Sequence, residues 1–151
     1  MSAPLKYLDD AIRSEYARYA NTYFAGFTYE LNSNTFESDA FPLLFMQLEE
    51  WFIKSDSNDS GIYRDVTLNF RYLVKAEFQG LDNRDYQNRI KDYDSAISAI
   101  SPFITYLDGL DKIQVLNKDD VRMRFFDRGV VVEDVIGIQF TLNLRIYCNF
   151  S

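Results

Sequence analysis

The stretch VIGIQFTLNLRIYCNF, residues 135–150, alternates between apolar and polar residues over nearly its whole length. Apolar side chains or cysteine occupy every even position from Ile136 to Phe150, and most odd positions are polar, such as Gln139 and Asn143. A period of two predicts a β-strand with one buried face and one face in water. Because strands in globular proteins usually have about five or six residues, the sequence predicts a closing strand of unusual length.

The segment RDVTLNFRYLVKAEF, residues 64–78, alternates in the same way. Its even positions from Val66 to Phe78 are apolar or aromatic, and most of its odd positions are polar. The pattern predicts a second long strand over residues 65–78. Each strand would extend about 45–50 Å at 3.3 Å per residue, whereas a compact domain of this length has a radius of gyration of about 15 Å.

Strands of this length must bend or project beyond their own domain, and their apolar row then needs cover. We therefore expect neighbouring copies of the chain to cover the apolar rows and to pair with the strand edges. A head-to-tail contact that is repeated around an axis closes a ring. The polar side chains that we expect to make subunit contacts, across the sheet or along a lumen, are Thr67, Asn69, Arg71, Thr141, Asn143 and Arg145.

Two segments have the spacing of amphipathic helices. Apolar and tyrosine side chains recur every three or four positions from Leu5 to Tyr19, and again from Tyr86 to Leu107. Pro102 interrupts the second segment, so we expect a kink or two successive helices there.

Residues 41–54, FPLLFMQLEEWFIK, fit either a helix with an apolar stripe or a buried strand. We favour the strand because a polar loop and the strand at residues 65–78 follow, which together predict a long hairpin. Residues 21–40 are expected to form an ordered arm or loop, in which residues 23–31 also fit a short strand. After the second helix, strands are expected in KIQVLN and VRMRFF, and VVVEDV leads into the closing strand.

This order of elements predicts an α+β fold, with a mainly antiparallel sheet, long hairpin strands and two helices packed on one face. The 151 residues fit a single domain over residues 1–151. No stretch approaches the run of about 20 apolar residues that a membrane span requires, so no membrane partner is expected.

The composition points away from several chemistries. A net charge of −7 and a pI of 4.6 argue against a dedicated nucleic-acid binder, which normally presents a basic face. The chain has no histidine and a single cysteine, Cys148, so the commonest general base and the usual zinc ligands are missing. We therefore expect a protein that is not an enzyme and that uses no cofactor and no metal.

Paired carboxylates are the remaining candidates for a metal site. Asp119–Asp120, Glu133–Asp134 and Glu49–Glu50 could hold a divalent cation, and residues 56–61 approach a calcium-loop pattern. Thr67 occupies the place of the distal glutamate in that pattern, so we expect solvated loop carboxylates instead. A metal-dependent nuclease that uses Asp119 and Asp120 is the least favoured alternative.

The chain resembles a known family in its order of elements. A helix, then FPLLFM leading into a hairpin with RDVTLNFRYLVKAEF, then a helix and a closing strand IQFTLNLRIYC, resembles the tail-completion and tail-terminator proteins of tailed bacteriophages over nearly the whole chain. The segment YFAGFTYELNSNTFESDA, residues 23–40, is longer than the resemblance requires.

The resemblance implies a virion structural protein without an active site, made in the host cytoplasm and assembled as a ring at the neck or tail end. Its partners would be copies of itself and other neck or tail proteins, and DNA would pass through the ring without specific binding. The alternative is a small cytosolic, non-enzymatic adaptor or ligand-binding domain.

Overall fold

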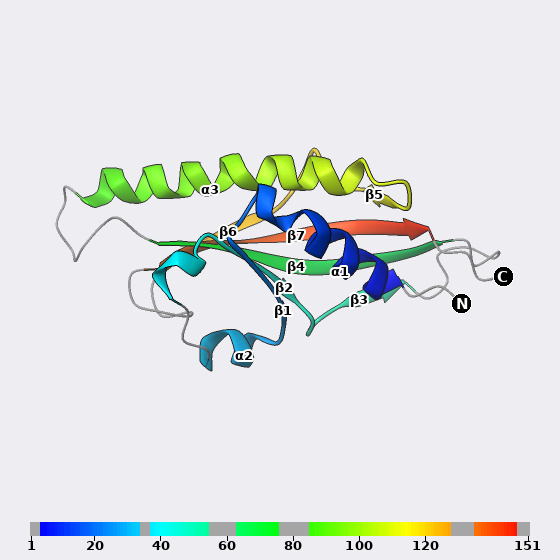
Figure 1. Ribbon diagram of the computed structural model, residues 1–151. Coiled ribbons are helices and arrows are strands. Elements are labelled where there is room, and N and C mark those ends of the chain that lie inside the picture. Colours follow the sequence, from blue (N-terminus) through cyan, green and yellow to red (C-terminus); the bar gives the residue numbers. More distant parts are fainter. Residues whose placement is uncertain (1–3, 34–36, 55–62, 76–84, 128–134, 148–151) are drawn as a thin grey trace.

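The computed structural model describes residues 4–33, 37–54, 63–75, 85–127 and 135–147. These residues form an α+β fold in which helices pack against one mixed sheet (Figure 1). The helical elements are α1 (Pro4–Glu15), η1 (Tyr16–Arg18), α2 (Thr28–Ser33), η2 (Ser38–Ala40) and α3 (Asp85–Asp108). The strands are β1 (Thr22–Gly26), β2 (Leu43–Gln47), β3 (Phe52–Lys54), β4 (Tyr63–Lys75), β5 (Ile113–Val115), β6 (Met123–Asp127) and β7 (Val135–Tyr147).

The two predicted long strands are present and form the centre of the sheet. β4 and β7 have 13 residues each and pair antiparallel over their full length, from Tyr63 opposite Tyr147 to Lys75 opposite Val135. β2 and β3 pair with the outer edge of β4, and β5 and β6 pair with the outer edge of β7, all antiparallel. β1 is parallel to β2. The strand pairing therefore extends to both sides of the β4–β7 pair.

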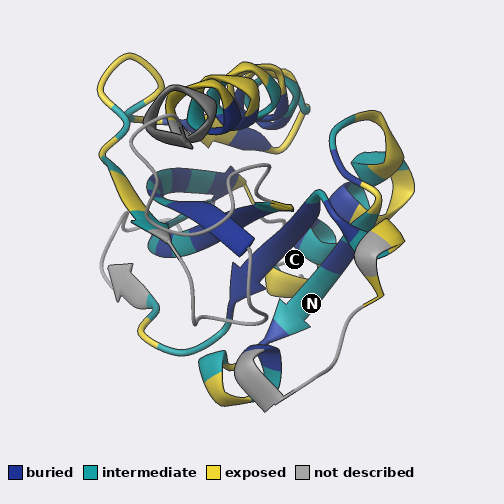
Figure 2. Cartoon of the chain, turned by 90° about the vertical axis from the view of Figure 1, so that its left-hand side faces the viewer, coloured by how far each residue is buried: buried dark blue, intermediate teal, exposed yellow. Residues whose placement is uncertain are grey.

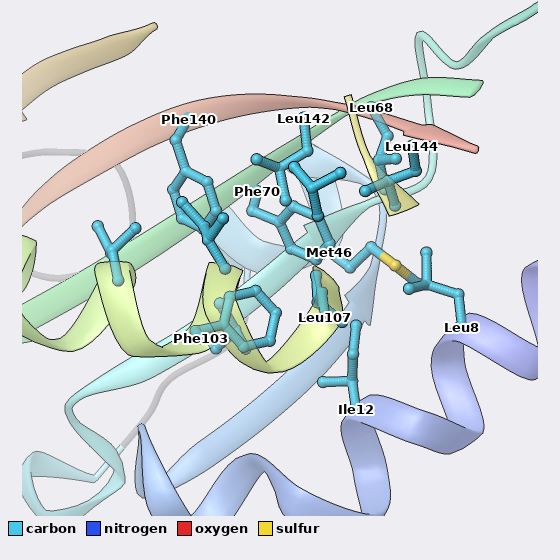
Figure 3. Packing of buried hydrophobic residues seen from close by; sticks show 14 of the residues in the cluster. Leu8, Ile12, Met46, Leu68, Phe70, Phe103, Leu107, Phe140, Leu142 and Leu144 are labelled. Carbon is cyan, nitrogen blue, oxygen red and sulfur yellow. The ribbon is translucent and has the colours of Figure 1, made fainter. Parts of the chain in front are cut away.

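The apolar face of the central strands is covered by helices of the same chain. Leu8 and Ile12 from α1 and Phe103 and Leu107 from α3 point into the layer formed by the sheet side chains (Figure 3). The outer side of α3 is exposed and the side facing the sheet is buried (Figure 2). The expectation that neighbouring copies must cover the apolar rows is therefore wrong for the described residues. The even-numbered residues of β4 and β7 that are buried in this layer are Val66, Leu68, Phe70, Tyr72, Ile138, Phe140, Leu142, Leu144 and Ile146.

The length of α3 explains why the chain can cover itself. Its 24 residues extend about 36 Å at 1.5 Å per residue, which nearly matches the roughly 43 Å of a 13-residue strand. The predicted interruption at Pro102 is not a helix boundary, because α3 continues through it. Ser98, Ser101 and Pro102 are all exposed, so water can bind the carbonyl that loses its proline N–H partner.

A second, smaller apolar cluster lies on the opposite face of the sheet, where Figure 1 shows α2. The turn before α2 is fixed by two carboxylates. Glu30 accepts a hydrogen bond from the Phe27 N–H at 2.9 Å, as in a capping box, and Glu49 accepts from the N–H and the hydroxyl of Thr28. The buried residues of this cluster are Leu31, Phe41, Leu43, Phe45, Leu73 and Val135.

Residues 41–54 contain strands, as favoured from the sequence, and form the hairpin partner of β4 in two pieces, β2 and β3. Residues 21–40 contain a strand of the sheet, β1, followed by α2 and η2. Cys148, the calcium-like loop at 56–61 and the pair Glu133–Asp134 lie outside the described residues. Of the helices in the described ranges, none combines the length and the apolar character that crossing a membrane would need.

Candidate functional site: the polar face of the central strands

The six residues predicted to make subunit contacts all lie on one face of the β4–β7 pair, because odd-numbered positions of both strands share that face. The strand register places Thr67 opposite Asn143 and Asn69 opposite Thr141. We call this surface the polar face. It consists of Asp65, Thr67, Asn69, Arg71, Gln139, Thr141, Asn143 and Arg145.

Two hydroxyl–amide pairs occupy the middle of the polar face. The Thr67 hydroxyl donates to Asn143 Oδ1 at 2.8 Å, and the Thr141 hydroxyl donates to Asn69 Oδ1 at 2.6 Å. Cross-strand pairs of this kind stabilise a sheet by roughly 0.2–1 kcal/mol each. They also fix the side chains in one arrangement, which presents a rigid row of polar groups on this face.

At one end of the polar face, Arg145 is bound to a carboxylate of its own chain. Its Nε and one terminal nitrogen donate to the two oxygens of Asp65 at 2.8 and 3.0 Å. The guanidinium carbon also lies 4.1 Å from the centre of the Tyr63 ring. The hydrogen bond with Asp65 is the main reason why the pKa of Arg145 is raised above its ordinary value. Arg145 is therefore engaged within its own subunit.

Arg71 lies opposite Gln139 rather than a carboxylate, and its situation differs from that of Arg145. It is half-buried, and its Nε is completely buried with no hydrogen-bond partner in the described part of the chain. Its guanidinium carbon lies 5.6 Å from the centre of the Phe126 ring. Burial is the main reason why the pKa of Arg71 is lowered from its ordinary value.

One residue of the site was missed by the sequence analysis. Between β5 and β6 the chain bulges away from β7, and Asn117 replaces the missing strand contacts with its side chain. Its Oδ1 accepts from the Asn143 N–H at 2.9 Å, and its Nδ2 donates to the Thr141 carbonyl at 3.1 Å. The sequence shows only a polar stretch, NKDD, between two predicted strands, and this stretch does not predict that Asn117 binds the backbone of β7. A cavity of about 320 Å³ beside it is lined by Asn117, Asp120, Arg122, Thr141 and Asn143.

Asn117→Ala is expected to lower the free energy of unfolding by about 1–3 kcal/mol, because two backbone groups of β7 lose their partner. Asn117→Asp should have a smaller effect, since a carboxylate still accepts from Asn143 but cannot donate to Thr141. Urea unfolding followed by circular dichroism measures both. The exposed neighbour Asp119 is the control, and Asp119→Ala should stay within about 0.5 kcal/mol of the wild type. A loss no larger for Asn117→Ala than for this control would contradict the bridging role.

The carboxylate pairs that the sequence suggested as metal ligands do not form a common site. Glu49 is held by Thr28, and these hydrogen bonds hold the pKa of Glu49 below its ordinary value. Asp119 and Asp120 are exposed. In the ranges that the structure describes, no three side chains among histidine, cysteine, aspartate and glutamate come together as a metal site would require.

No protein-family model matches the chain, and no curated protein is significantly similar to it.

Proposed function

We propose that the protein is a non-enzymatic structural subunit that assembles with copies of itself into a ring. We further propose that this ring belongs to the neck or tail end of a bacteriophage particle, where it joins head to tail or completes the tail and leaves a channel for DNA. The virion assignment depends on the resemblance in element order, and other neck or tail proteins would be its further partners. The observation that carries the ring is that, within the described residues, the sheet has an edge without backbone partners on each of two opposite sides.

The first unpaired edge belongs to β6. The Thr141 N–H donates to the Arg122 carbonyl at 3.3 Å, so alternate residues from Arg122 onward bond to β7. The backbone groups of Met123 and Phe125 consequently point away from β7. Among the described residues, no backbone group bonds to them from outside. Such an edge is a template for a strand of another chain.

In the part of the chain that the structure describes, the second edge without backbone partners belongs to β1. The Leu48 N–H donates to the Gly26 carbonyl at 2.8 Å, so even-numbered residues of β1 bond to β2, and the backbone groups of Tyr23 and Ala25 point the other way. β1 and β6 lie on opposite sides of the central pair. A contact between unlike edges is head-to-tail, and repetition of such a contact closes a ring when the rotation permits. The net charge of −7 would keep DNA from adhering inside it.

Phe125→Pro tests this assembly. Proline removes the outward N–H of the β6 edge without removing a hydrogen bond to β7, and edge strands tolerate proline at such positions. Phe125→Ala is the matched control, because both variants lose the ring that stacks on Tyr93 at 4.8 Å and only proline blocks the edge. Light scattering coupled to size exclusion, over a range of concentrations, should give one multiple of the subunit mass for the wild type and for Phe125→Ala.

The proline variant should remain folded by circular dichroism but stay monomeric. A wild type that is monomeric at every concentration would refute self-assembly. Equal assembly of the proline and alanine variants would refute the β6 edge as the contact. Electron microscopy of the oligomer distinguishes a closed ring from an open filament.

One observation favours the alternative of a monomeric ligand-binding or adaptor domain. A cavity of about 510 Å³ lies between α1 and the strands β1 and β2. Such a volume, with a mainly apolar lining, suits a small ligand. A strict monomer in light scattering would favour this reading over the ring. The lining residues are Leu5, Lys6, Asp9, Arg13, Ala25, Met46 and Leu48.

A further inference from the structure

We infer that Arg71 and Arg124 form a binding site for an oxyanion, either a carboxylate or a phosphate group, on the polar face of the sheet. The inference depends on the register of three neighbouring strands and on an unused buried donor. It does not depend on ring formation.

The three strands place two arginines in one row. Arg71 on β4 lies opposite Gln139 on β7, and Gln139 lies opposite Arg124 on β6. Residues that are opposite in neighbouring strands share a face, so the two arginines flank Gln139 on the same side of the sheet. Two strand spacings separate their Cα atoms by about 10 Å, a gap that two long side chains can close from either side over a small ion.

Both guanidinium groups have donors to offer. Neither Arg71 nor Arg124 donates a hydrogen bond to any described residue, although each has five N–H groups. Arg124 is exposed, so a ligand can reach the row from its side. The Arg71 Nε is buried without an acceptor among the described residues. Because native proteins rarely leave such a donor unpaired, we expect its acceptor to come from outside these residues.

The charged groups around Arg71 do not supply this acceptor. Glu49 and Glu50 favour the charged form of Arg71 through space, and Arg124 opposes it. Glu49 is engaged by Thr28 instead of Arg71. An oxyanion between the two arginines would pair with the planar donor fork of each and remove their mutual repulsion. The side-chain amide of Gln139, which lies between the two arginines, could donate a further hydrogen bond.

The surface charge makes the test selective. With a net charge of −7, the protein repels anions in general, so a saturable anion signal requires a local site. Inorganic phosphate and acetate, each titrated at ionic strength held constant with sodium chloride, probe the tetrahedral and planar forms of the ligand. The Nε–H resonance of Arg71 in nitrogen–proton spectra reports binding at the buried donor itself.

In the wild type, at least one of the two anions should shift this resonance with saturation. Arg124→Gln, which changes an exposed side chain, should weaken that binding by roughly tenfold or more, as the loss of a charged hydrogen-bond donor predicts. Arg71→Lys keeps the charge but removes the fork and should weaken binding similarly, measured by the thermal shift that the anion produces. Arg18→Gln is the control, because it removes the same charge from η1 and should leave binding unchanged.

Two results would overturn the inference. One is the absence of a saturable shift with both phosphate and acetate. The other is an equal loss of binding in Arg18→Gln and Arg124→Gln, which would indicate general electrostatic attraction. Because binding is read from the Arg71 resonance and assembly from the mass in solution, failure of the one is distinguishable from failure of the other.

Discussion

Phe140→Ala is expected to lower the free energy of unfolding by about 3–5 kcal/mol, as deletion of a fully buried aromatic side chain usually does. Phe140 has 0% exposure at the centre of β7. Its ring stacks on Phe70 of β4, with centroids 5.4 Å apart, and contacts Phe103 of α3 edge-on at 6.3 Å. Phe70 and Phe103 also meet edge-on at 5.5 Å. Removal of one ring leaves a cavity between the sheet and the helix that covers it.

The matched control is Phe125→Ala. Phe125 lies on the neighbouring strand β6 and its ring stacks on Tyr93, but it is 52% exposed. Loss of the Phe125 ring should lower the free energy of unfolding by no more than about 1.5 kcal/mol. This is the upper value for the interaction of an aromatic pair, apart from the contribution of buried area. Urea unfolding, followed by circular dichroism and by the fluorescence of Trp51, gives both values. Equal losses in the two variants would mean that the Phe70–Phe103–Phe140 cluster does not hold α3 on the sheet.

The central strands could be predicted from the sequence because their alternation continues for thirteen residues. One residue of β4 departs from this alternation, because Leu73 is apolar although it occupies an odd position. It belongs to the smaller cluster on the opposite face, beneath α2. The short segment of α2 has no long periodic pattern, and its turn is fixed by Glu49 from a distant part of the chain. Sequence alone could not assign that contact.

The composition of the polar face could also be predicted, but its pairing could not. Arg71 and Arg145 occur in similar patterns, and only the register shows that Arg145 faces Asp65 whereas Arg71 faces Gln139. About sixty residues of chain and a long helix separate the two strands, and no local pattern fixes their register. The same register turns one arginine into part of an ion pair and leaves the other with unused donors.

The self-covered apolar face changes how assembly would occur. A chain whose own α1 and α3 bury the apolar rows can fold before it meets a partner. Its interface would then be made by strand edges and polar groups rather than by a shared apolar core. Such interfaces depend on backbone hydrogen bonds. A proline on β6 therefore tests the interface more directly than the replacement of an apolar side chain does.

Gly137→Ala is expected to lower the free energy of unfolding by about 1–3 kcal/mol, the usual cost of overpacking a filled site. Gly137 lies on β7 between Leu73 of β4 and Phe126 of β6. A Cβ atom at this position would lie 2.3 Å from Phe126 Cζ and 2.6 Å from Leu73 Cδ2. Neither distance is compatible with van der Waals contact, so the rings and branches around it would have to move.

Gly109→Ala is the control, since a Cβ there would meet only the Thr105 and Tyr106 carbonyls at 3.4 and 3.6 Å. That substitution should be neutral or slightly stabilising, by up to about 1 kcal/mol, because it restricts the unfolded chain. A double-mutant cycle separates the steric cause from others: Phe126→Ala should cost less in the Gly137→Ala background than in the wild type, because it removes the nearest clashing atom. If the two changes are additive, or if Gly137→Ala is as stable as Gly109→Ala, crowding by Phe126 is not what requires glycine at this position.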